Sequence, residues 1–251
     1  MSMRSAVVVA HPDDEILWLS FAVASAEHVV LCFGEPFGNP ARADARRRAV
    51  ANLPLTNLVN LAIPESGTRL LVDWLYPLMT STGMDISEPE ARQRYDENFD
   101  QLVAALRPVL SGCADVYTHN PWGEYGHPEH IQVYRAVAAL QAELGYTIWF
   151  SNYVGPLTWP LAQKLGAEPL WAQRRVVRPD MATARRLQWV YLRHRAWTWG
   201  LTHRWPREEV IYAQPPGKDR STWHTLAGET LLDVDGLRWW PPGGDARKRL
   251  P

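Results

Sequence analysis

A chain of 251 residues, of which 46% are apolar, is long enough to bury the core of one compact α/β domain. Its formal net charge of −1 gives no electrostatic basis for binding nucleic acid or an anionic membrane surface. The sequence contains no run of about 20 apolar residues, which a membrane span needs, and no signal-peptide profile, so we expect a cytoplasmic protein. Cys32 and Cys113 lie far apart in apolar surroundings, which predicts small core residues in a reducing compartment.

Strands and helices are predicted to alternate along the first part of the chain. In chain order we expect a strand at 4–10, a helix at 14–26, strand 28–33, helix 41–53, strand 57–61, helix 91–107, strand 114–118, helix 128–144 and strand 146–153. Such alternation indicates right-handed crossovers and a Rossmann-like, mostly parallel sheet flanked by helices. Neither Gly-x-Gly-x-x-Gly nor a phosphate-loop motif is present, so this fold class does not by itself imply a nucleotide cofactor.

One domain is expected over residues 1–251, with a core at 1–155, a tryptophan-rich C-terminal extension at 156–240 and a disordered polar tail at 241–251. Residues 64–90 interrupt the alternation and are predicted to form a lid or wall of a cleft. Aromatic rings in the extension can stack on sugars, or they can fill a subdomain or a homo-oligomer interface, which is the commoner use of aromatic area. The tryptophans are Trp159, Trp171, Trp189, Trp197, Trp199, Trp205, Trp223, Trp239 and Trp240.

The first strand ends in side chains of the kind that bind metals. Its apolar residues 7–10 stop at His11, which is followed by a proline and by Asp13, Asp14 and Glu15. In open α/β sheets the carboxyl ends of strands are where ligands bind. The neighbouring carboxylates of Asp13 and Asp14 must diverge, so one can bind a metal while the other stays free. The alternative is a helix start, with Asp13 as the cap and the next two acids in the first turn.

A second cluster, at residues 118–130, again follows a short apolar stretch. Pro128 suits the first position of a helix, so His127 is expected at the cap and His130 within the first turn. Three residues apart across a helix start, both histidines can reach one cavity. His11, Asp14 and one of these two histidines then form a mixed nitrogen and oxygen set with open positions, which is the pattern of a catalytic zinc. Iron, manganese or cobalt could use the same ligands.

The sequence AHPDDE at residues 10–15, followed by YGHPEH at 125–130, resembles the LmbE-like (PIG-L) family of zinc-dependent sugar de-N-acetylases. This family includes N-acetylglucosaminyl-phosphatidylinositol de-N-acetylases, deacetylases of the mycothiol and bacillithiol pathways, and enzymes that mature aminoglycoside and glycopeptide antibiotics. The resemblance is strongest over residues 5–140 and is thin beyond residue 150.

The resemblance implies that His11, Asp14 and His130 bind one zinc ion per chain. It further implies that Asp13 is the general base and that His127 is the polarising or acid group.

Three other residues are weaker candidates. Tyr125 matches a family tyrosine near the substrate carbonyl, although an aromatic packed under a loop is an equal alternative. Glu65 begins an acid-Ser-Gly element whose acid contacts sugar hydroxyls in the family, although alone it would more often be a solvated acid. Trp122, in the loop that presents the two histidines, is our candidate for a platform under the sugar.

The predicted helix at 41–53 departs from the family, which usually carries Arg-x-x-Glu there. Residues 41–50 read ARADARRRAV, with no glutamate. Arg42 is the best-registered counterpart of the family arginine, with Arg46 as an alternative, whereas Arg47 and Arg48 fit a solvated basic face. This departure puts the identity of the substrate in doubt.

The resemblance and the residues together predict metal-assisted removal of an N-acetyl group from an amino sugar or a sugar-containing small molecule. Two alternatives remain. One is a zinc amidase acting on a thiol conjugate or another acylated natural product. The other is a non-catalytic sugar-binding protein with a vestigial site, which the intact pair Asp13 and Asp14 disfavours.

Overall fold

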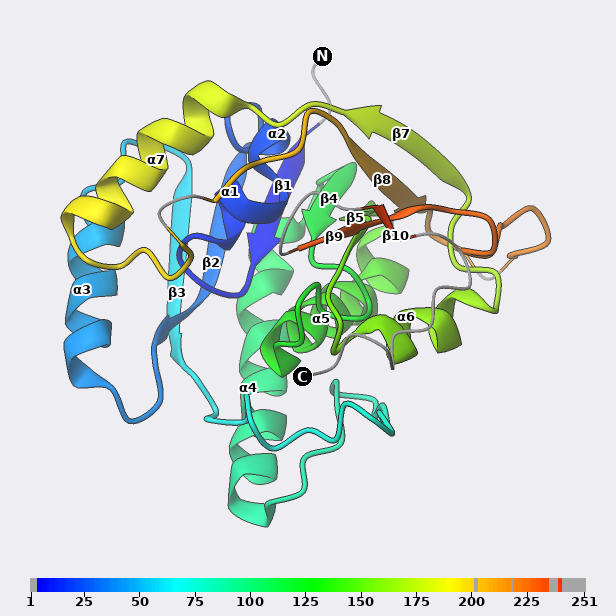
Figure 1. The fold of residues 1–251 in the computed structure, drawn as a ribbon, viewed down its shortest axis with the longest axis horizontal. Coiled ribbons are helices and arrows are strands. Elements are labelled where there is room, and N and C mark those ends of the chain that lie inside the picture. Colours follow the sequence, from blue (N-terminus) through cyan, green and yellow to red (C-terminus); the bar gives the residue numbers. More distant parts are fainter. Residues whose placement is uncertain (1–3, 201–202, 218, 235–238, 241–251) are drawn as a thin grey trace.

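The computed structural model describes residues 4–200, 203–217, 219–234 and 239–240, and these include a seven-stranded sheet in the order β3-β2-β1-β4-β5-β8-β7 (Figure 1). The first five strands of this order run parallel. The last two pair antiparallel, β8 with β5 and β7 with β8. The mostly parallel, Rossmann-like sheet is thus confirmed. Its strands are β1 (Ser5–Val9), β2 (His28–Glu35), β3 (Leu58–Pro64), β4 (Asp115–Thr118), β5 (Thr147–Ser151), β7 (Gln173–Val177) and β8 (Glu209–Gln214).

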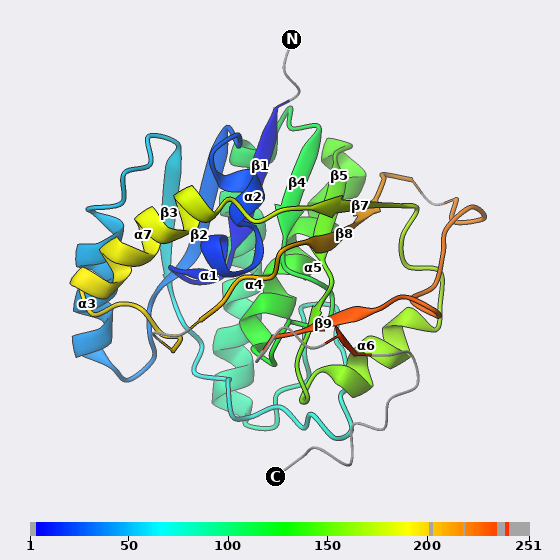
Figure 2. The same cartoon turned by 45° about the horizontal axis from the view of Figure 1, so that its top comes forward.

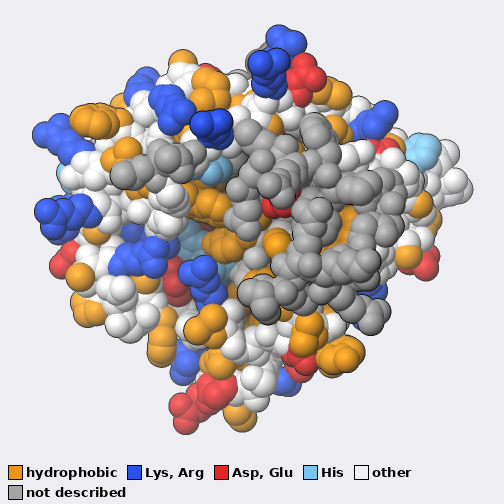
Figure 3. All heavy atoms as spheres, in the orientation of Figure 1, with side chains coloured by type: hydrophobic (Ala, Val, Ile, Leu, Met, Phe, Trp, Pro, Cys, Tyr) orange, Lys and Arg blue, Asp and Glu red, His pale blue; other side chains and the backbone are white. Residues whose placement is uncertain are grey.

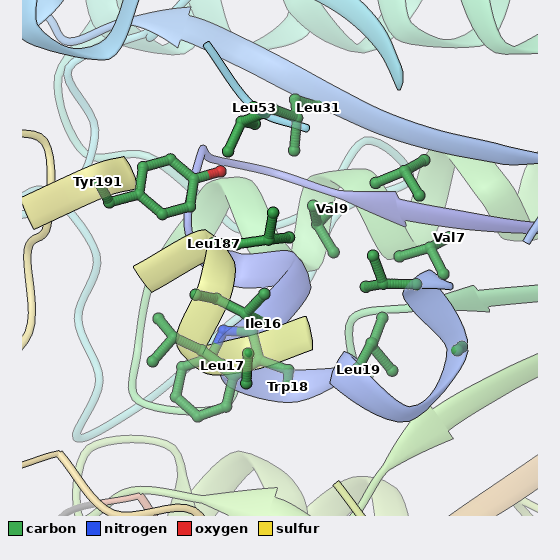
Figure 4. Packing of buried hydrophobic residues seen from close by; sticks show 14 of the residues in the cluster. Val7, Val9, Ile16, Leu17, Trp18, Leu19, Leu31, Leu53, Leu187 and Tyr191 are labelled. Carbon is green, nitrogen blue, oxygen red and sulfur yellow. The ribbon is translucent and has the colours of Figure 1, made fainter. Parts of the chain in front are cut away.

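Helices cover both faces of this sheet (Figures 1 and 2). Side chains of β1 alternate between the two cores, with Val7 and Val9 in one cluster and Val8 in the other. The first cluster, shown in part in Figure 4, includes residues of α1 (Asp14–Trp18), α2 (Ser20–Val23), α3 (Pro40–Val50) and α7 (Met181–Arg193). The second includes residues of α4 (Pro89–Leu110) and α5 (Pro128–Leu144).

The order of strands reverses between β1 and β4. From β1 the chain continues to β2 and β3 on one side, whereas β4 and β5 lie on the other. At such a switch point the crossover connections leave in opposite directions and a crevice opens at the carboxyl ends of the two strands. Residues 11–15 and 119–130 follow these two ends, so the fold brings both sequence motifs to one place.

Two predicted elements are interrupted in the structure. The expected helix at 14–26 is α1 and α2, separated at Leu19, whose φ of −141° and ψ of 22° leave the helical region. Residues 16–19 are all nearly inaccessible to solvent, and one straight helix would turn part of this apolar run away from the core.

The expected strand at 146–153 is β5 followed by β6 (Tyr153–Val154), which belongs to a second sheet with β9 (Leu231–Asp233) and β10 (Trp239–Trp240). The break falls at Asn152, whose side chain accepts from Val210 N and donates to Thr230 O, at 3.2 Å each. The other predicted boundaries differ from the observed ones by a few residues, and helix 128–144 is confirmed as predicted.

The described part of residues 156–240 is built into the body of the fold. It supplies β7 and β8 to the main sheet, α6 (Trp159–Gly166) and α7. Trp159, Trp171 and Trp205 are buried, as the packing interpretation expects, whereas Trp189 is 67% exposed. The predicted tail at 241–251 lies outside the described residues.

The connection between β3 and α4, residues 65–88, contains no helix, and its one bridge in the described structure joins Met79 to Met84. Its first residues line the cleft, as a wall would. Among the described residues, no helix combines the length and apolar character that crossing a membrane requires. Cys32 and Cys113 are buried free thiols.

Candidate metal centre and active-site cleft

The turn after β1 separates the two neighbouring aspartates. Asp13 has a φ of 103°, a left-handed conformation that costs free energy for a residue with a Cβ, and its side chain does not cap α1. The predicted helix start is thus present, with Asp13 at the N-cap and two acids in the first turn, but Asp13 does not cap the helix with its side chain. Its backbone N–H instead donates to Glu15 Oε2 at 3.0 Å. Tyr191 of α7 donates to the other oxygen of Glu15 at 2.7 Å, so the C-terminal part of the chain supports this strained turn.

Asp14 lies between two histidines. Its Oδ2 atom is 3.2 Å from His11 Nδ1 and 3.2 Å from His130 Nε2. The other oxygen, Oδ1, accepts from Trp18 Nε1 at 3.0 Å, which fixes the plane of the carboxylate. All three proposed ligands are at most 3% exposed. The structure thus brings together His11, Asp14 and His130, the set that the family resemblance implied.

A glutamate orients each of the two histidines. His130 Nδ1 is 2.8 Å from Glu124 Oε2, and His11 Nε2 is 2.9 Å from Glu129 Oε2. Burial lowers the pKa of His130, but Asp14 and Glu124 outweigh it and raise that pKa to about 10, so the ring is protonated when no cation is bound. A metal would displace the protons from His130 Nε2 and His11 Nδ1 and leave those on the nitrogens that face the glutamates. A carboxylate behind the histidine is the usual arrangement at metal centres, because it fixes the tautomer and the ring.

His119 also lies within ligand distance of Asp14 and His130. Its Nε2, however, accepts from Ala10 N at 2.8 Å, and its Nδ1 is 3.1 Å from Glu124 Oε2. Both ring nitrogens are thus engaged, so we assign His119 to holding β1 and Glu124 in place. Burial, and after it the charge of His130, lowers the pKa of His119, which agrees with a neutral ring.

The donor set fits a divalent cation. His130 Nε2 is buried and has no well-formed hydrogen bond among the described residues, although it lies beside Asp14. Four carboxylates are buried around the site, whereas Arg46 is the one arginine buried there among the described residues. The carboxylates belong to Asp13, Asp14, Glu124 and Glu129. A buried excess of negative charge is costly unless a cation compensates it.

Asp13 is held apart from this cluster by Thr198. Its Oδ2 accepts from Thr198 Oγ1 at 2.7 Å and from Thr198 N at 3.2 Å. Asp13 also lines the cleft. Burial, followed by the negative charge of Asp14, raises the pKa of Asp13 to about 7, which is a value suited to exchanging protons near neutral pH.

His127 occupies the N-cap of α5, directly before Pro128. Its Nδ1 accepts from Glu129 N at 3.4 Å, so the ring proton is on Nε2. The side chain lines the cleft beside His11, with the two ring centroids 4.5 Å apart. Burial, followed by the charges of His11 and His130, lowers the pKa of His127 well below its usual range, which favours a neutral ring. His127 also lies within ligand distance of His11 and His130, which makes it the competing candidate for the third metal ligand.

Of the two aromatic candidates from the sequence, only Tyr125 lines the cleft. Trp122 is fully buried and donates from Nε1 to Tyr153 O at 2.7 Å, so our prediction of Trp122 as a sugar platform is wrong. Its indole faces the core because the loop turns back at Gly123, where φ is 76°. Trp199 lines the cleft instead and contacts Tyr125 edge to face at 5.3 Å.

Glu65 and Arg42 both line the cleft, but Glu65 is already paired. Arg46 Nη1 lies 2.5 Å from Glu65 Oε1, and the same oxygen is 3.5 Å from His11 Nε2. Arg46 is thus the arginine buried against the site, whereas Arg42 is half-buried at the N-terminus of α3.

These side chains surround a cleft of about 1040 Å³. In Figure 3 histidine side chains lie at the bottom of a hollow, with basic side chains at its edge. The cleft is large enough for a substrate bigger than a single sugar ring, since pockets for drug-sized ligands have volumes of about 300–1,000 Å³.

Several site residues were not assigned from the sequence. His119, Glu124 and Glu129 lie within or beside the second motif, and their residue types could have suggested a second layer behind the ligands. Thr198 and Trp199 carry no such signal, because only the packing of α7 and the segment after it brings them to β1.

No protein-family model matches the chain. A curated relative, the 1D-myo-inositol 2-acetamido-2-deoxy-alpha-D-glucopyranoside deacetylase of Mycolicibacterium smegmatis, is 32% identical over 196 residues. The match covers 67% of this chain and 66% of the relative, so the chain spans slightly less than two thirds of that protein's length.

Two solved structures share the fold. A deacetylase in complex with teicoplanin, from the teicoplanin biosynthesis pathway, superposes with a TM-score of 0.55 at 14% identity and covers 86% of this chain and 100% of its own. A zinc-inhibited form of teicoplanin deacetylase superposes with a TM-score of 0.53 at 15% identity and covers 84% and 97%. The two motifs, the fold and the curated relative together show that this chain belongs to the LmbE-like (PIG-L) family.

Proposed function

We propose that this protein is a metal-dependent hydrolase that removes the N-acetyl group from an amino sugar, free or within a larger small molecule. The observation that carries the proposal is that two adjacent carboxylates occupy different environments. Asp14 is enclosed by His11 and His130, whereas Asp13 is held towards the cleft by Thr198. The curated relative is named as a deacetylase of an acetamido sugar, which supports the same reaction class.

His11, Asp14 and His130 are the residues that would hold the metal, for which we propose zinc, one ion per chain. When bound, it would supply Lewis-acid chemistry that polarises the acetamide carbonyl and acidifies a water molecule. Glu124 and Glu129 keep the two histidines in the tautomer that can bind it.

Asp13 is proposed as the general base. Its Oδ2 atom is occupied by the two donors of Thr198, so the other oxygen is the one available to take a proton from the attacking water. The same proton can then pass to the leaving nitrogen. The amide C–N bond breaks, water adds its oxygen to the acyl carbon, and the products are a free amine and acetate.

His127 is proposed to stabilise the oxyanion. With Nδ1 occupied by Glu129 N, its Nε2–H is the donor that faces the cleft. A neutral donor placed before the reaction begins needs no reorganisation as charge develops on the carbonyl oxygen. Tyr125 lines the same wall, and we propose that its hydroxyl assists.

Substrate contacts are proposed for Glu65, Arg42 and Trp199. Glu65 retains Oε2 for a sugar hydroxyl, because its contacts with Arg46 and His11 both use Oε1. Trp199 replaces Trp122 as the proposed platform for a sugar ring, since it lines the cleft whereas Trp122 is buried.

Acetate release from N-acetylglucosamine conjugates, measured by mass spectrometry on purified protein of known metal content, tests this function. The expected result is conversion to free amine and acetate by wild type, with metal retained but turnover lost in Asp13→Asn. Cleavage of a different amide would show an amidase of another substrate class. Tight sugar binding without turnover in the metal-loaded protein would refute the hydrolase and favour a binding protein.

A further inference from the structure

The mouth of the cleft carries two arginines that take no part in the proposed proton and acyl chemistry, and only one of them, Arg42, is already a proposed substrate contact. Arg69 follows the acid-Ser-Gly element in the connection after β3, and Arg42 lies in the first turn of α3. Both line the same cavity. Neither guanidinium forms an ion pair with a carboxylate within 4.0 Å in the described structure, and no partner of Arg69 other than the face of Tyr125, 5.9 Å from its ring centroid, is found there.

The acids of the cleft already have partners. Asp14 lies against His11 and His130, Asp13 accepts from Thr198, and Glu65 pairs with Arg46. Although burial acts in the opposite direction, the charge of Arg42 helps to lower the pKa of Glu65 from beyond ion-pair distance. None of these acids, however, forms an ion pair with Arg42 or Arg69 in the described structure. A structural role for either arginine would normally show as a bond to a carboxylate or a carbonyl, and such a bond is absent for both guanidinium groups within the described residues.

The surroundings of Arg42 and Arg69 add to the positive electrostatic potential of these two guanidinium groups. The first turn of α3 contains no acid, and Asn39 caps it by accepting from Arg42 N at 3.0 Å. The metal proposed for the bottom of the cleft would contribute further positive charge. A guanidinium presents a planar fork of N–H donors that fits carboxylate or phosphate oxygens in pairs, and such charge-assisted bonds are stronger than neutral ones.

We infer that the natural substrate carries an anionic group, a carboxylate or a phosphate, which Arg69 and Arg42 bind at the mouth of the cleft while the acetamide reaches the bottom. This inference rests on the proposed deacetylation and specifies its substrate class. Arg69 is the distinguishing residue, because it belongs to the wall of the cleft formed by the connection after β3 and lies outside both motifs.

Three glycosides that differ only at the anomeric substituent provide the test. They are methyl N-acetylglucosaminide, which is neutral, the carboxymethyl glycoside, which carries a carboxylate, and N-acetylglucosamine 1-phosphate. We expect kcat/KM of the wild type for at least one anionic glycoside to exceed that for the methyl glycoside by about tenfold. The comparison between the two anionic compounds identifies which anion is preferred, and added salt should reduce the preference because Arg69 is exposed.

Variants then locate the effect. Arg69→Ala, Arg42→Ala and the double variant should bring the ratio of anionic to neutral kcat/KM towards one. Arg48→Ala is the matched control, since Arg48 is an exposed arginine of the same helix that does not line the cleft. Equal kcat/KM for all three glycosides in the wild type, or a preference that survives in the double variant with an unchanged Tm, would overturn the inference.

The outcome separates this inference from the proposed function. Hydrolysis of the methyl glycoside without any anion preference leaves the deacetylase intact and removes the anion site. If none of the three compounds is hydrolysed, the proposed function fails. Dissociation constants of the same compounds, measured by calorimetry, then show whether the anion site exists. In that measurement, tighter binding of an anionic compound than of the methyl glycoside supports the anion site if Arg69→Ala abolishes the difference. Equal binding of all three compounds refutes the site.

Discussion

Thr198 should position the general base although it lies 185 residues further along the chain. The perturbation is Thr198→Val, which keeps the shape of the side chain and removes its hydroxyl. Asp13 then loses the 2.7 Å bond to Oγ1 and keeps the longer 3.2 Å bond to the backbone N–H of residue 198. Because Asp13 sits in a strained left-handed turn, its carboxylate depends on such contacts to stay in place.

The magnitude follows from the strength of the bond. A hydrogen bond to a charged group contributes about 1.5–3 kcal/mol, and Thr198 is exposed, so we take the lower end. If that free energy no longer favours the working position of Asp13, the fraction of molecules with the base in place falls by about tenfold. We therefore expect kcat to fall by about tenfold, with KM nearly unchanged.

The assay is acetate release under saturating and subsaturating substrate, with metal content and Tm measured on the same samples. Thr198→Ser restores the hydroxyl and should recover most of the lost kcat. Thr56→Val is a matched control at an exposed threonine outside the cleft. A Thr198→Val protein with wild-type kcat would refute the positioning role, and so would an equal loss in Thr198→Ser.

Three further predictions address the ligands, the base and the stability of the fold. His130→Ala and Asp14→Ala should each lose the metal by elemental analysis while His127→Ala keeps it; the reverse pattern for the two histidines would exchange their roles. Asp13→Asn should keep the metal and lose about 10²-fold in kcat or more, so near-normal turnover would remove it from the mechanism. Burial raises the pKa of Glu209 from 4.5 to about 8, with the nearby Tyr153 hydroxyl partly offsetting this, so the native protein holds a proton that the unfolded chain loses. Glu209 should therefore contribute a fall in the unfolding free energy of about 1.4 kcal/mol per pH unit between these values. Denaturant titrations of Glu209→Gln should show a slope that is shallower by this amount, while Glu15 and Asp13, whose pKa values burial also raises, contribute equally to both proteins.

The cluster of candidate metal ligands could be predicted because its residues are local to two strand ends. A buried β-branched strand that stops at a histidine and two acids, and a proline that starts a helix after His127, define positions that short-range rules describe well. The reversal of strand order at β1 and β4 then brings those ends together. The structure has His11, Asp14 and His130 in contact for this reason.

The walls of the cleft could not be predicted in the same way. Trp122 looked available because it lies between two site residues, yet the turn at Gly123 directs its indole into the core. Thr198 and Trp199 reach the cleft only because α7 packs on α1 and α2, a contact between distant parts of the chain that no periodicity reveals. Likewise, the break at Leu19 follows from burying four consecutive apolar residues rather than from any local breaker.

The packing of α3 against α7 explains why α3 lacks the glutamate of the family's Arg-x-x-Glu pattern. Counted from Arg42, the family glutamate falls at Ala45, which is buried in the apolar cluster that also contains Leu187 of α7. A glutamate there would place a charge among apolar side chains without a partner, which costs several kcal/mol or more. The neighbouring Arg46 reaches the cleft side of the helix instead and binds Glu65. Glu65, the acid proposed to contact the sugar, is therefore held in place by Arg46. We expect the chemistry at β1 and α5 to be shared with relatives and the recognition of the substrate to differ.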